Sequence, residues 1–302
     1  MSAERRPDVR YRMPAVFGPA PGPRQKADGT PWSAAETGTM RSEWFAVSYR
    51  TEPAALEALL PPGFTLRGEP VVALSMASFH DLYWLAGRGY GIARVEFAVH
   101  YKGRSEAIDG TFCPVMWEGV PDAILTGREE MGFPKLFADI PEVEVDTDRG
   151  VASGSASWFD HTFLEARAFD LRETPPPDGP VTLPGTDGPT LQFKYVPRVG
   201  PDGTVGTDLA YVTTSAPPPG TARAAEPIDL RGVTSRRFTG TGEVTWHAAT
   251  FEQLPTSFHA VNGMAAIPVL EVTGAELVVF SAPGITVASG GVRAVEPLGD
   301  NA

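Results

Sequence analysis

The strongest constraint on the fold is a ten-residue run, residues 92–101, in which apolar and polar side chains alternate. Alternation with a period of two places successive side chains on opposite faces of a β-strand. The odd positions are all apolar, whereas Arg94, Glu96 and His100 lie on the other face. The usual interpretation is a half-buried sheet whose polar face meets solvent. The alternative is a closed barrel whose polar face lines a ligand cavity, where Arg94 could hold a substrate carboxylate.

The rest of the chain indicates many short strands and few helices. Its 32 glycines and 30 prolines suit turns between strands better than long helices. Residues 53–60 and 121–131 have helical spacing of apolar residues after an initial proline, and Gly132 and Pro134 would end the second helix. Strands are predicted at residues 44–50, 71–76, 92–101, 111–116, 136–145, 151–158, 163–169, 191–197, 210–214, 233–238, 243–246 and 270–280. The sequence therefore predicts an α+β fold that is mainly antiparallel β.

Turn and loop signals separate these elements. Residues 201–203, Pro-Asp-Gly, predict a hairpin turn. Residues 173–189 and 217–227 lack periodicity and are rich in proline, so we expect long loops there. Glycines at positions 87, 89 and 91 predict a flexible turn, and their spacing does not match a dinucleotide-binding fingerprint.

The chain has 302 residues, which is enough for one sizeable core. Residues 1–40 mix charges, proline, glycine and small residues with little periodicity. We expect them to form an N-terminal arm that is partly extended or disordered. Residues 41–302 are predicted to form a single domain.

Charge and hydropathy limit the classes of partner. The net charge of −12 argues against nucleic acid or an anionic membrane. No apolar run has the length of a membrane span, and the arginines near the N-terminus are not followed by the apolar stretch of a secretory signal. Cys113 is the single cysteine, and its apolar neighbours favour an inert core thiol. We expect a cytoplasmic protein.

Motifs for several common chemistries are missing from the sequence. The five histidines are not at metal-ligand spacing, and there is no H-E-x-x-H. No nucleophile elbow and no P-loop occurs. The sequence therefore predicts no metal site and no cofactor, and it gives no support to a hydrolase, kinase or nicotinamide enzyme.

One lysine, Lys135, lies inside an apolar segment, between Phe133-Pro134 and Leu136-Phe137. The ordinary interpretation is a lysine that lies along apolar surface and extends its ammonium to water. The alternative is a buried lysine, because desolvation favours the neutral amine and lowers the pKa. A neutral lysine amine can attack a ketone and form a Schiff base.

The segment around Lys135 resembles the active-site segment of the acetoacetate decarboxylase-like superfamily. The resemblance rests on Gly127-Arg128-Glu129 followed, four residues later, by Pro134-Lys135. Weaker similarities come in the same order at residues 43–51, 80–81, 191–197 and 239–242, so that roughly residues 40–280 are covered. The resemblance implies a closed β-cone or barrel with a few short helices, a Schiff-base lysine at position 135, and homo-oligomers.

Four positions depart from the decarboxylase pattern. A decarboxylase has a second lysine where this chain has Leu136, glutamates where it has Ser75 and Tyr90, and an arginine where it has Ser42, with Arg41 one place away. These departures resemble the pyruvate aldolase-dehydratase branch of the superfamily. The resemblance thus implies condensation of pyruvate, or a similar 2-oxo acid, with an aldehyde, followed by loss of water.

The resemblance also suggests roles for individual residues. Lys135 would form the imine and Tyr90 would shuttle protons. Arg94 or Arg41 would hold the substrate carboxylate. Phe133 and Leu136 would line the pocket. Without the second lysine, desolvation by Phe133, Leu136 and Phe137 would lower the pKa of Lys135, with secondary help from Arg94 or Arg128.

Two other functions stay open at this stage. The same imine could decarboxylate a β-keto acid, as in acetoacetate decarboxylation. Alternatively, the chain could be a non-catalytic barrel that binds a small ligand and keeps its lysine protonated. In all three cases the expected partners are small molecules, a 2-oxo acid and an aldehyde in the favoured one.

Overall fold

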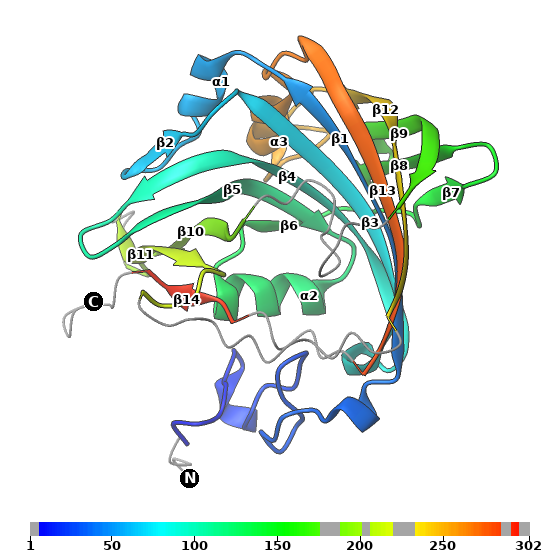
Figure 1. The fold of residues 1–302 in the computed structure, drawn as a ribbon. Coiled ribbons are helices and arrows are strands. Elements are labelled where there is room, and N and C mark those ends of the chain that lie inside the picture. The colour runs from blue at the N-terminus through cyan, green and yellow to red at the C-terminus, as the bar shows by residue number, and fades with distance from the viewer. Residues whose placement is uncertain (1–5, 176–187, 201–205, 220–232, 285–290, 296–302) are drawn as a thin grey trace.

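The computed structural model describes residues 6–175, 188–200, 206–219, 233–284 and 291–295. One large, strongly curved sheet dominates this part of the chain (Figure 1). Its strands are β1 (Thr39–Arg50), β2 (Phe64–Leu66), β3 (Val71–Leu82), β4 (Arg88–Lys102), β5 (Ala107–Glu118), β6 (Lys135–Phe137), β7 (Glu144–Asp146), β8 (Val151–Trp158), β9 (His161–Thr174), β10 (Thr190–Pro197), β11 (Thr207–Thr214), β12 (Thr234–Trp246), β13 (Glu271–Pro283) and β14 (Arg293–Ala294).

Short helices accompany the sheet. They are the α-helices α1 (Pro53–Glu57), α2 (Pro121–Thr126) and α3 (Phe258–Ala265), the 3₁₀ turns η1 (Ala15–Phe17), η2 (Ala34–Glu36) and η3 (Tyr83–Leu85), and the π-helical turn η4 (Gly127–Met131). None of the helices in the described ranges is long and apolar enough to cross a membrane.

The strand order is β14-β11-β10-β5-β4-β3-β1-β13-β12-β9-β8-β7, with β2 paired to β4 and β6 to β5. Neighbours are antiparallel except β10 with β5 and β6 with β5. The predicted mainly antiparallel α+β class is therefore confirmed. The sheet differs from the predicted closed barrel in one respect. Its two end strands, β14 and β7, are not paired with each other within the described ranges. A single bridge instead links the segment after β6 to β8, since Asp139 and Ser157 exchange two backbone hydrogen bonds.

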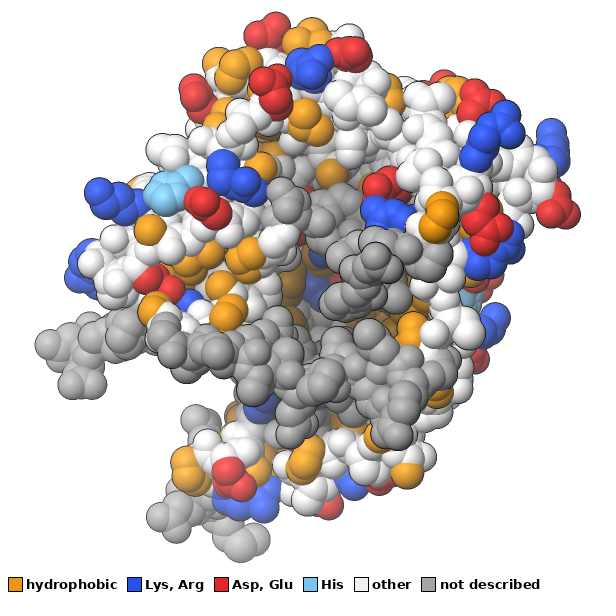
Figure 2. Space-filling model, in the orientation of Figure 1, with side chains coloured by type: hydrophobic (Ala, Val, Ile, Leu, Met, Phe, Trp, Pro, Cys, Tyr) orange, Lys and Arg blue, Asp and Glu red, His pale blue; other side chains and the backbone are white. Residues whose placement is uncertain are grey.

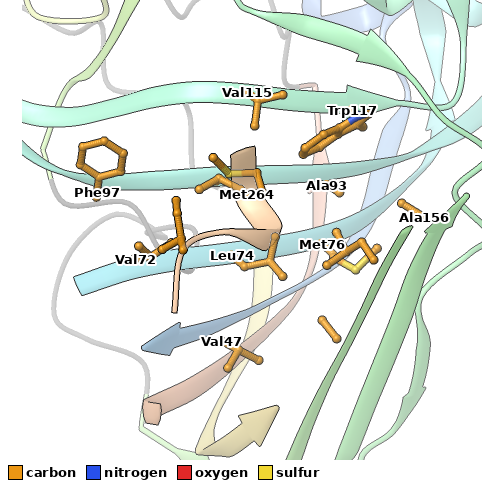
Figure 3. Close-up of a cluster of buried hydrophobic side chains, with 14 of the residues drawn as sticks. Val47, Val72, Leu74, Met76, Ala93, Phe97, Val115, Trp117, Ala156 and Met264 are labelled. Atoms are coloured by element: carbon orange, nitrogen blue, oxygen red, sulfur yellow. The ribbon is translucent and has the colours of Figure 1, made fainter. Parts of the chain in front are cut away.

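The main core fills the concave side of the sheet. Alternate side chains of β3, β4 and β5, such as Leu74, Phe97 and Trp117, point into one apolar cluster (Figure 3). Helix α3 closes this core with buried Val261 and Met264. The sequence did not predict α3, because small residues interrupt its short apolar stripe.

The polar face of β4 is buried at Arg94 and Glu96, which corrects the expectation of a solvated face there, whereas the side chain of His100 is 43% exposed. Arg94 and Glu96 are 7% and 1% exposed. A second apolar cluster, which we call the lysine-side cluster, lies on this face and consists of Trp44, Ala77, Ile92, Cys113 and Met116. Helix α2 packs against β5 and β6, and the N-terminal segment lies beyond it (Figure 1). The N-terminal segment, which is remote from β4 in sequence, thus helps to enclose the polar face of the sheet.

Glycine explains two further differences from the sequence predictions. Gly89 and Gly91 belong to β4 rather than to a turn. Glycine is needed at position 91 because a Cβ there would lie 2.6 Å from the carbonyl oxygen of Ile140. Segments 233–238 and 243–246 form one strand, β12, where Gly240 and Gly242 approach the β9 backbone closely. Close backbone approach is a reason for glycine inside a strand.

Two other predicted elements can be compared with the structure. The helix predicted at 121–131 is α2 followed by η4, and Gly132 ends it in the left-handed conformation as expected. The strand predicted at 136–145 is instead two short strands, β6 and β7, separated by Pro141, which has no N–H to donate.

Some predictions concern residues at the edge of the described ranges. The hairpin of β10 and β11 is present, but its predicted turn at 201–203 lies outside the described residues. Most of the predicted loops 173–189 and 217–227 also lies outside them. The division of the chain at residue 40 stays a prediction.

We expect Gly91→Ala to destabilise the protein by about 1–3 kcal/mol, because the added methyl group would overlap the Ile140 backbone and side chain. Gly263→Ala is a matched control: this glycine lies in α3 with no atom within 4 Å of the added Cβ, so alanine should be neutral or stabilising by up to ~1 kcal/mol. Denaturant unfolding measures both. Equal stability of the two variants would contradict the packing described for β4.

Candidate active site

Lys135 begins β6 and points toward the lysine-side cluster. Met116 of β5 pairs with Arg94 of β4 on one side and with Lys135 on the other, so these three residues form a row across three strands. Lys135 is 9% exposed. Its Nζ lies 2.7 Å from Oε1 of Glu118 and donates to the carbonyl oxygen of Ala123 at 3.1 Å. The ammonium is therefore held between the end of β5 and helix α2.

The sequence before Lys135 builds a narrow slot for its side chain. Gly132 ends η4 with φ 82°, and Pro134 then keeps the chain extended into β6. Arg128 donates to the carbonyl oxygen of Lys135 at 2.8 Å, which ties the two elements together. A Cβ on Gly127 would lie 2.3 Å from Cε of Lys135, so the lysine crosses directly over this glycine. Any larger residue at 127 would displace the amine.

Burial controls the charge of Lys135 and of its partner Glu118. Desolvation lowers the pKa of Lys135, and the opposing effect of the Glu118 carboxylate is smaller. Desolvation also raises the pKa of Glu118, which is 1% exposed. Both shifts move the pair toward its uncharged form, an amine beside a carboxylic acid. The predicted lowering of the lysine pKa by desolvation is confirmed, and a proton acceptor lies within hydrogen-bond distance.

A second buried ion pair lies on the same face. Arg94 Nη2 is 2.7 Å from Oε2 of Glu96, and the guanidinium carbon lies 5.0 Å from the centre of the Trp44 ring. Burial raises the pKa of Glu96, while Arg94 opposes this shift. Arg94 Nε has no hydrogen-bond acceptor among the described residues. Nη2 and the Glu96 oxygen beside it also lack a partner in hydrogen-bond geometry there, so this buried pair leaves donors and an acceptor unsatisfied.

The buried thiol of Cys113 connects the two pairs. The charges of Glu96, Arg94 and Lys135 all act on it, although burial is the main cause of its raised pKa. Both ion pairs therefore lie within electrostatic range of one side chain. Because the raised pKa keeps the thiol protonated, Cys113 is not a nucleophile here, in agreement with the core role expected from sequence.

Tyr90 lines a cavity of about 400 Å³ at the rim of the sheet. Its ring packs against Phe79 with centroids 5.3 Å apart. Burial raises the pKa of the phenol well above its usual value, and Glu118 adds to the shift. Arg41 lines the same cavity but is ion-paired to Asp81 at 2.8 Å. Lys135 does not line this cavity. Tyr90 lines it and is also within electrostatic range of Glu118, so this residue connects the cavity with the Lys135–Glu118 pair.

The structure corrects one predicted pocket residue. Leu136 packs against the main core, because it follows Lys135 in a strand and therefore points to the opposite face. Phe137 is 41% exposed and cannot desolvate the amine. Phe133 does lie beside it, with its ring centre 5.6 Å from Nζ. Applying strand alternation to residues 135–137 would have predicted the placement of Leu136.

Three residues of the candidate site escaped the sequence analysis. Glu118 was overlooked because it lies just beyond the apolar run predicted as a strand, and Glu96 because its face was interpreted as solvated. Arg24 acts on Lys135 from the N-terminal segment and lowers its pKa. The sequence carried no signal for this last contact, since it depends on how the segment folds back. Arg94 and Arg128, the cations expected to help, are not among the causes of the lysine shift.

The described residues contain no group of three or more His, Cys, Asp or Glu side chains arranged to hold a metal ion. The charged groups of the site are instead the two ion pairs and the N-terminal arginines.

Comparison with known proteins identifies relatives of the chain. A family model described as acetoacetate decarboxylase (ADC) matches residues 19–288. The acetoacetate decarboxylase of Acidiphilium cryptum (strain JF-5) is 33% identical over 130 residues, which is 40% of this chain and 50% of that protein. The acetoacetate decarboxylase of Clostridium botulinum (strain Eklund 17B / Type B) is 30% identical over 103 residues, 32% of this chain and 39% of that protein. The chain thus matches half or less of the length of these curated relatives.

Solved structures share the fold. The enduracididine biosynthesis enzyme MppR, complexed with the condensation product of pyruvate and imidazole 4-carboxaldehyde, superimposes with a TM-score of 0.59 at 19% identity, covering 85% of this chain and 88% of that one. Acetoacetate decarboxylase from Legionella pneumophila subsp. pneumophila str. Philadelphia 1 gives a TM-score of 0.56 at 19% identity, covering 86% and 88%.

We expect Glu118→Gln to lower the pKa of Lys135 further, because the substitution removes the carboxylate that stabilises the ammonium and keeps the volume of the side chain. The measurement is the pH dependence of modification by an amine-selective reagent, followed on the peptide that contains Lys135. Glu173→Gln, at an exposed ion pair on β9, is the control and should leave the curve unchanged. An upward shift in Glu118→Gln would contradict the assigned electrostatics.

Proposed function

Because the chain belongs to the acetoacetate decarboxylase family, we propose that it is a lyase that forms a Schiff base between Lys135 and a small 2-oxo acid. The observation that carries the proposal is the buried Lys135–Glu118 pair. A free lysine with a pKa near 10.4 is almost fully protonated at neutral pH and attacks ketones slowly. Burial that favours the amine removes this obstacle.

Glu118 provides the proton chemistry of imine formation in this proposal. Its carboxylate takes the proton of the ammonium and becomes the carboxylic acid that burial favours. The amine of Lys135 adds to the ketone carbon and gives a carbinolamine. The proton held by Glu118 then passes to the carbinolamine hydroxyl, which leaves as water. The general acid and the nucleophile are already 2.7 Å apart.

The substrate carboxylate has a candidate partner in Arg94. Its Nε is buried and lacks an acceptor in the described part of the chain, and Nη2, although 2.7 Å from Glu96, makes no hydrogen bond there either. The row that joins Arg94 and Lys135 across three strands spans about 10 Å between outer strands. Two side chains that extend toward each other across this distance can contact the two ends of a small 2-oxo acid.

Aldol condensation and dehydration form the favoured continuation. The imine of pyruvate loses a methyl proton to give an enamine, whose carbon attacks an aldehyde. Loss of water and hydrolysis of the imine then release an unsaturated 2-oxo acid and the free lysine. Overall, pyruvate and an aldehyde give this product and one water. Tyr90 is suited to carry protons, because it lines the rim cavity that could admit the aldehyde and is within electrostatic range of Glu118.

Decarboxylation of a β-keto acid is the second candidate. The curated relatives are called acetoacetate decarboxylases, and the reaction starts with the same imine. Three observations favour condensation instead. Leu136 stands where decarboxylases have a second lysine, Ser75 and Tyr90 stand where they have glutamates, and MppR, which shares the fold, is known with a condensation product of pyruvate.

We expect Lys135→Ala and Lys135→Gln to abolish trapping of a pyruvate adduct by borohydride, because no other lysine of the site can form the imine. The chain has only four lysines, at positions 26, 102, 135 and 194, so the adduct is easily located by peptide mass spectrometry. Lys102→Gln, at an exposed position, is the control and should trap pyruvate as the wild type does. An adduct on the Lys135→Ala protein would contradict the proposal, and no wild-type adduct with any keto acid would favour the ligand-binding barrel.

The reaction type has its own test. With pyruvate and an aromatic or unsaturated aldehyde, the wild-type protein should form a conjugated product that absorbs in the near ultraviolet. With acetoacetate it should release carbon dioxide only slowly, because the additional lysine and glutamates are replaced. Rapid release of carbon dioxide without a condensation product would make decarboxylation the function.

A further inference from the structure

The N-terminal segment, residues 6–38, contacts the candidate site through arginines. Glu130 of η4 has a side chain that is 8% exposed, and both of its oxygens are bound by this segment. Arg12 Nη1 lies 2.7 Å from Oε1, and Arg24 binds Oε2 through Nε at 2.8 Å and Nη2 at 2.6 Å. The segment therefore attaches firmly to the turn that precedes Lys135, although it is about a hundred residues away in sequence.

Arg24 spans the whole of this turn. Besides Glu130, it reaches the carbonyl oxygen of Thr126 at 3.5 Å and the sulfur of Met131 at 3.0 Å. Its side chain is 10% exposed. Gly127, over which the lysine side chain crosses, lies between these contacts. The guanidinium thus holds the same turn whose inner side forms the slot for Lys135.

The backbone around Arg24 is itself held in place. Trp32 Nε1 donates to the carbonyl oxygen of Gly22 at 2.8 Å, and the hydroxyl of Tyr83 donates to that of Pro23 at 2.7 Å. The rings of Trp32 and Tyr83 pack edge to face, 5.2 Å apart. Gln25 is 4% exposed and bonds to the backbone of Arg10 and Ala20. Such support fixes a functional side chain more precisely than a mobile arm can.

The opposite side of η4 is held by the β10–β11 hairpin. Lys194 donates to the carbonyl oxygen of Glu129 at 2.6 Å, and Thr213 donates to that of Met131 at 2.9 Å. The turn is therefore clamped between the hairpin and the N-terminal segment. Only the N-terminal clamp brings cationic side chains to a buried carboxylate, with Arg10, Arg12 and Arg24 near the single charge of Glu130.

We propose that Arg24 is a positioning residue for Lys135. It fixes the turn against the lysine side chain, and it brings a cation from the N-terminal segment into electrostatic range of the amine. The charged and titratable groups that act on Lys135 are Glu118 and Cys113 from β5 and Arg24 from the N-terminal segment. Arg24 lowers the pKa of the lysine, third in importance after desolvation and the opposing effect of Glu118. The inference rests on the proposed function, since it explains how the nucleophile is kept ready.

The test compares three variants in the full-length protein. In Arg24→Gln, the pH midpoint of Lys135 modification should rise, because a repelling cation is lost and the slot loosens. A rise of one pH unit would make modification, and pyruvate trapping, about tenfold slower at neutral pH. Arg24→Lys keeps the charge without the fork of donors. It should keep a midpoint near that of the wild type but trap pyruvate more slowly even at a pH above the midpoint.

Arg10→Gln is the matched control, because its side chain is 51% exposed and its Nε lies 3.9 Å from Glu130. This variant should titrate and trap as the wild type does. A midpoint in Arg24→Gln equal to that of Arg10→Gln would overturn the proposal. If Arg24→Gln does not fold, Arg24→Lys decides the question. Trapping of pyruvate by Arg24→Lys at the wild-type rate, at a pH above the midpoint, would also overturn the proposal.

The modification curve separates this proposal from the proposed function. It reports on the lysine without any keto acid, so a protein that never traps pyruvate still shows whether Arg24 shifts the midpoint. Conversely, trapping that persists with an unchanged midpoint in Arg24→Gln would reject the role of Arg24 and leave the Schiff-base function standing.

Discussion

The buried contact between Lys135 and Glu118 sets the requirements for the rest of the site. Removing an ammonium and a carboxylate from water costs several kcal/mol per ion, and their attraction repays this only in a good geometry. Here burial favours the uncharged pair, as the lowered pKa of Lys135 and the raised pKa of Glu118 indicate. A site that needs a neutral amine thus uses the same desolvation that would otherwise destabilise the fold.

Segments that are remote from one another in sequence bury the Lys135–Glu118 pair. The sheet contributes the face of β4 and β5 that carries the charged residues, and α2 with its π-helical turn lies against it. The N-terminal segment then fastens the turn through Glu130. Without the turn and this fastening, the face that carries Arg94 and Glu96 would be more open to water. The charge of Lys135 therefore depends on tertiary contacts and not on its immediate neighbours in sequence.

The sequence predicted much of this and missed the rest for physical reasons. Alternation in residues 92–101 correctly separated the apolar from the polar face, but alternation alone does not say what covers a face. The motif around Lys135 pointed to the proposed nucleophile, whereas its buried partner Glu118 is brought near only by the parallel pairing of β5 and β6. Leu136 was assigned to the pocket because it is apolar and adjacent to Lys135. Its position in a strand, which turns it to the opposite face, was not considered. Arg24 could not be predicted, since its contact with Glu130 joins residues 106 positions apart.

The most direct test of the account is a titration of the Lys135 amine in the unmodified protein. With only four lysines, isotope labelling of lysine gives few NMR signals, and Lys135→Arg identifies the one that matters. The account predicts that this amine titrates below the ordinary lysine pKa of about 10.4, because burial favours its neutral form. A Lys135 that titrates near 10 would contradict a neutral nucleophile, and the site would then be one that holds an anion with a permanent ammonium.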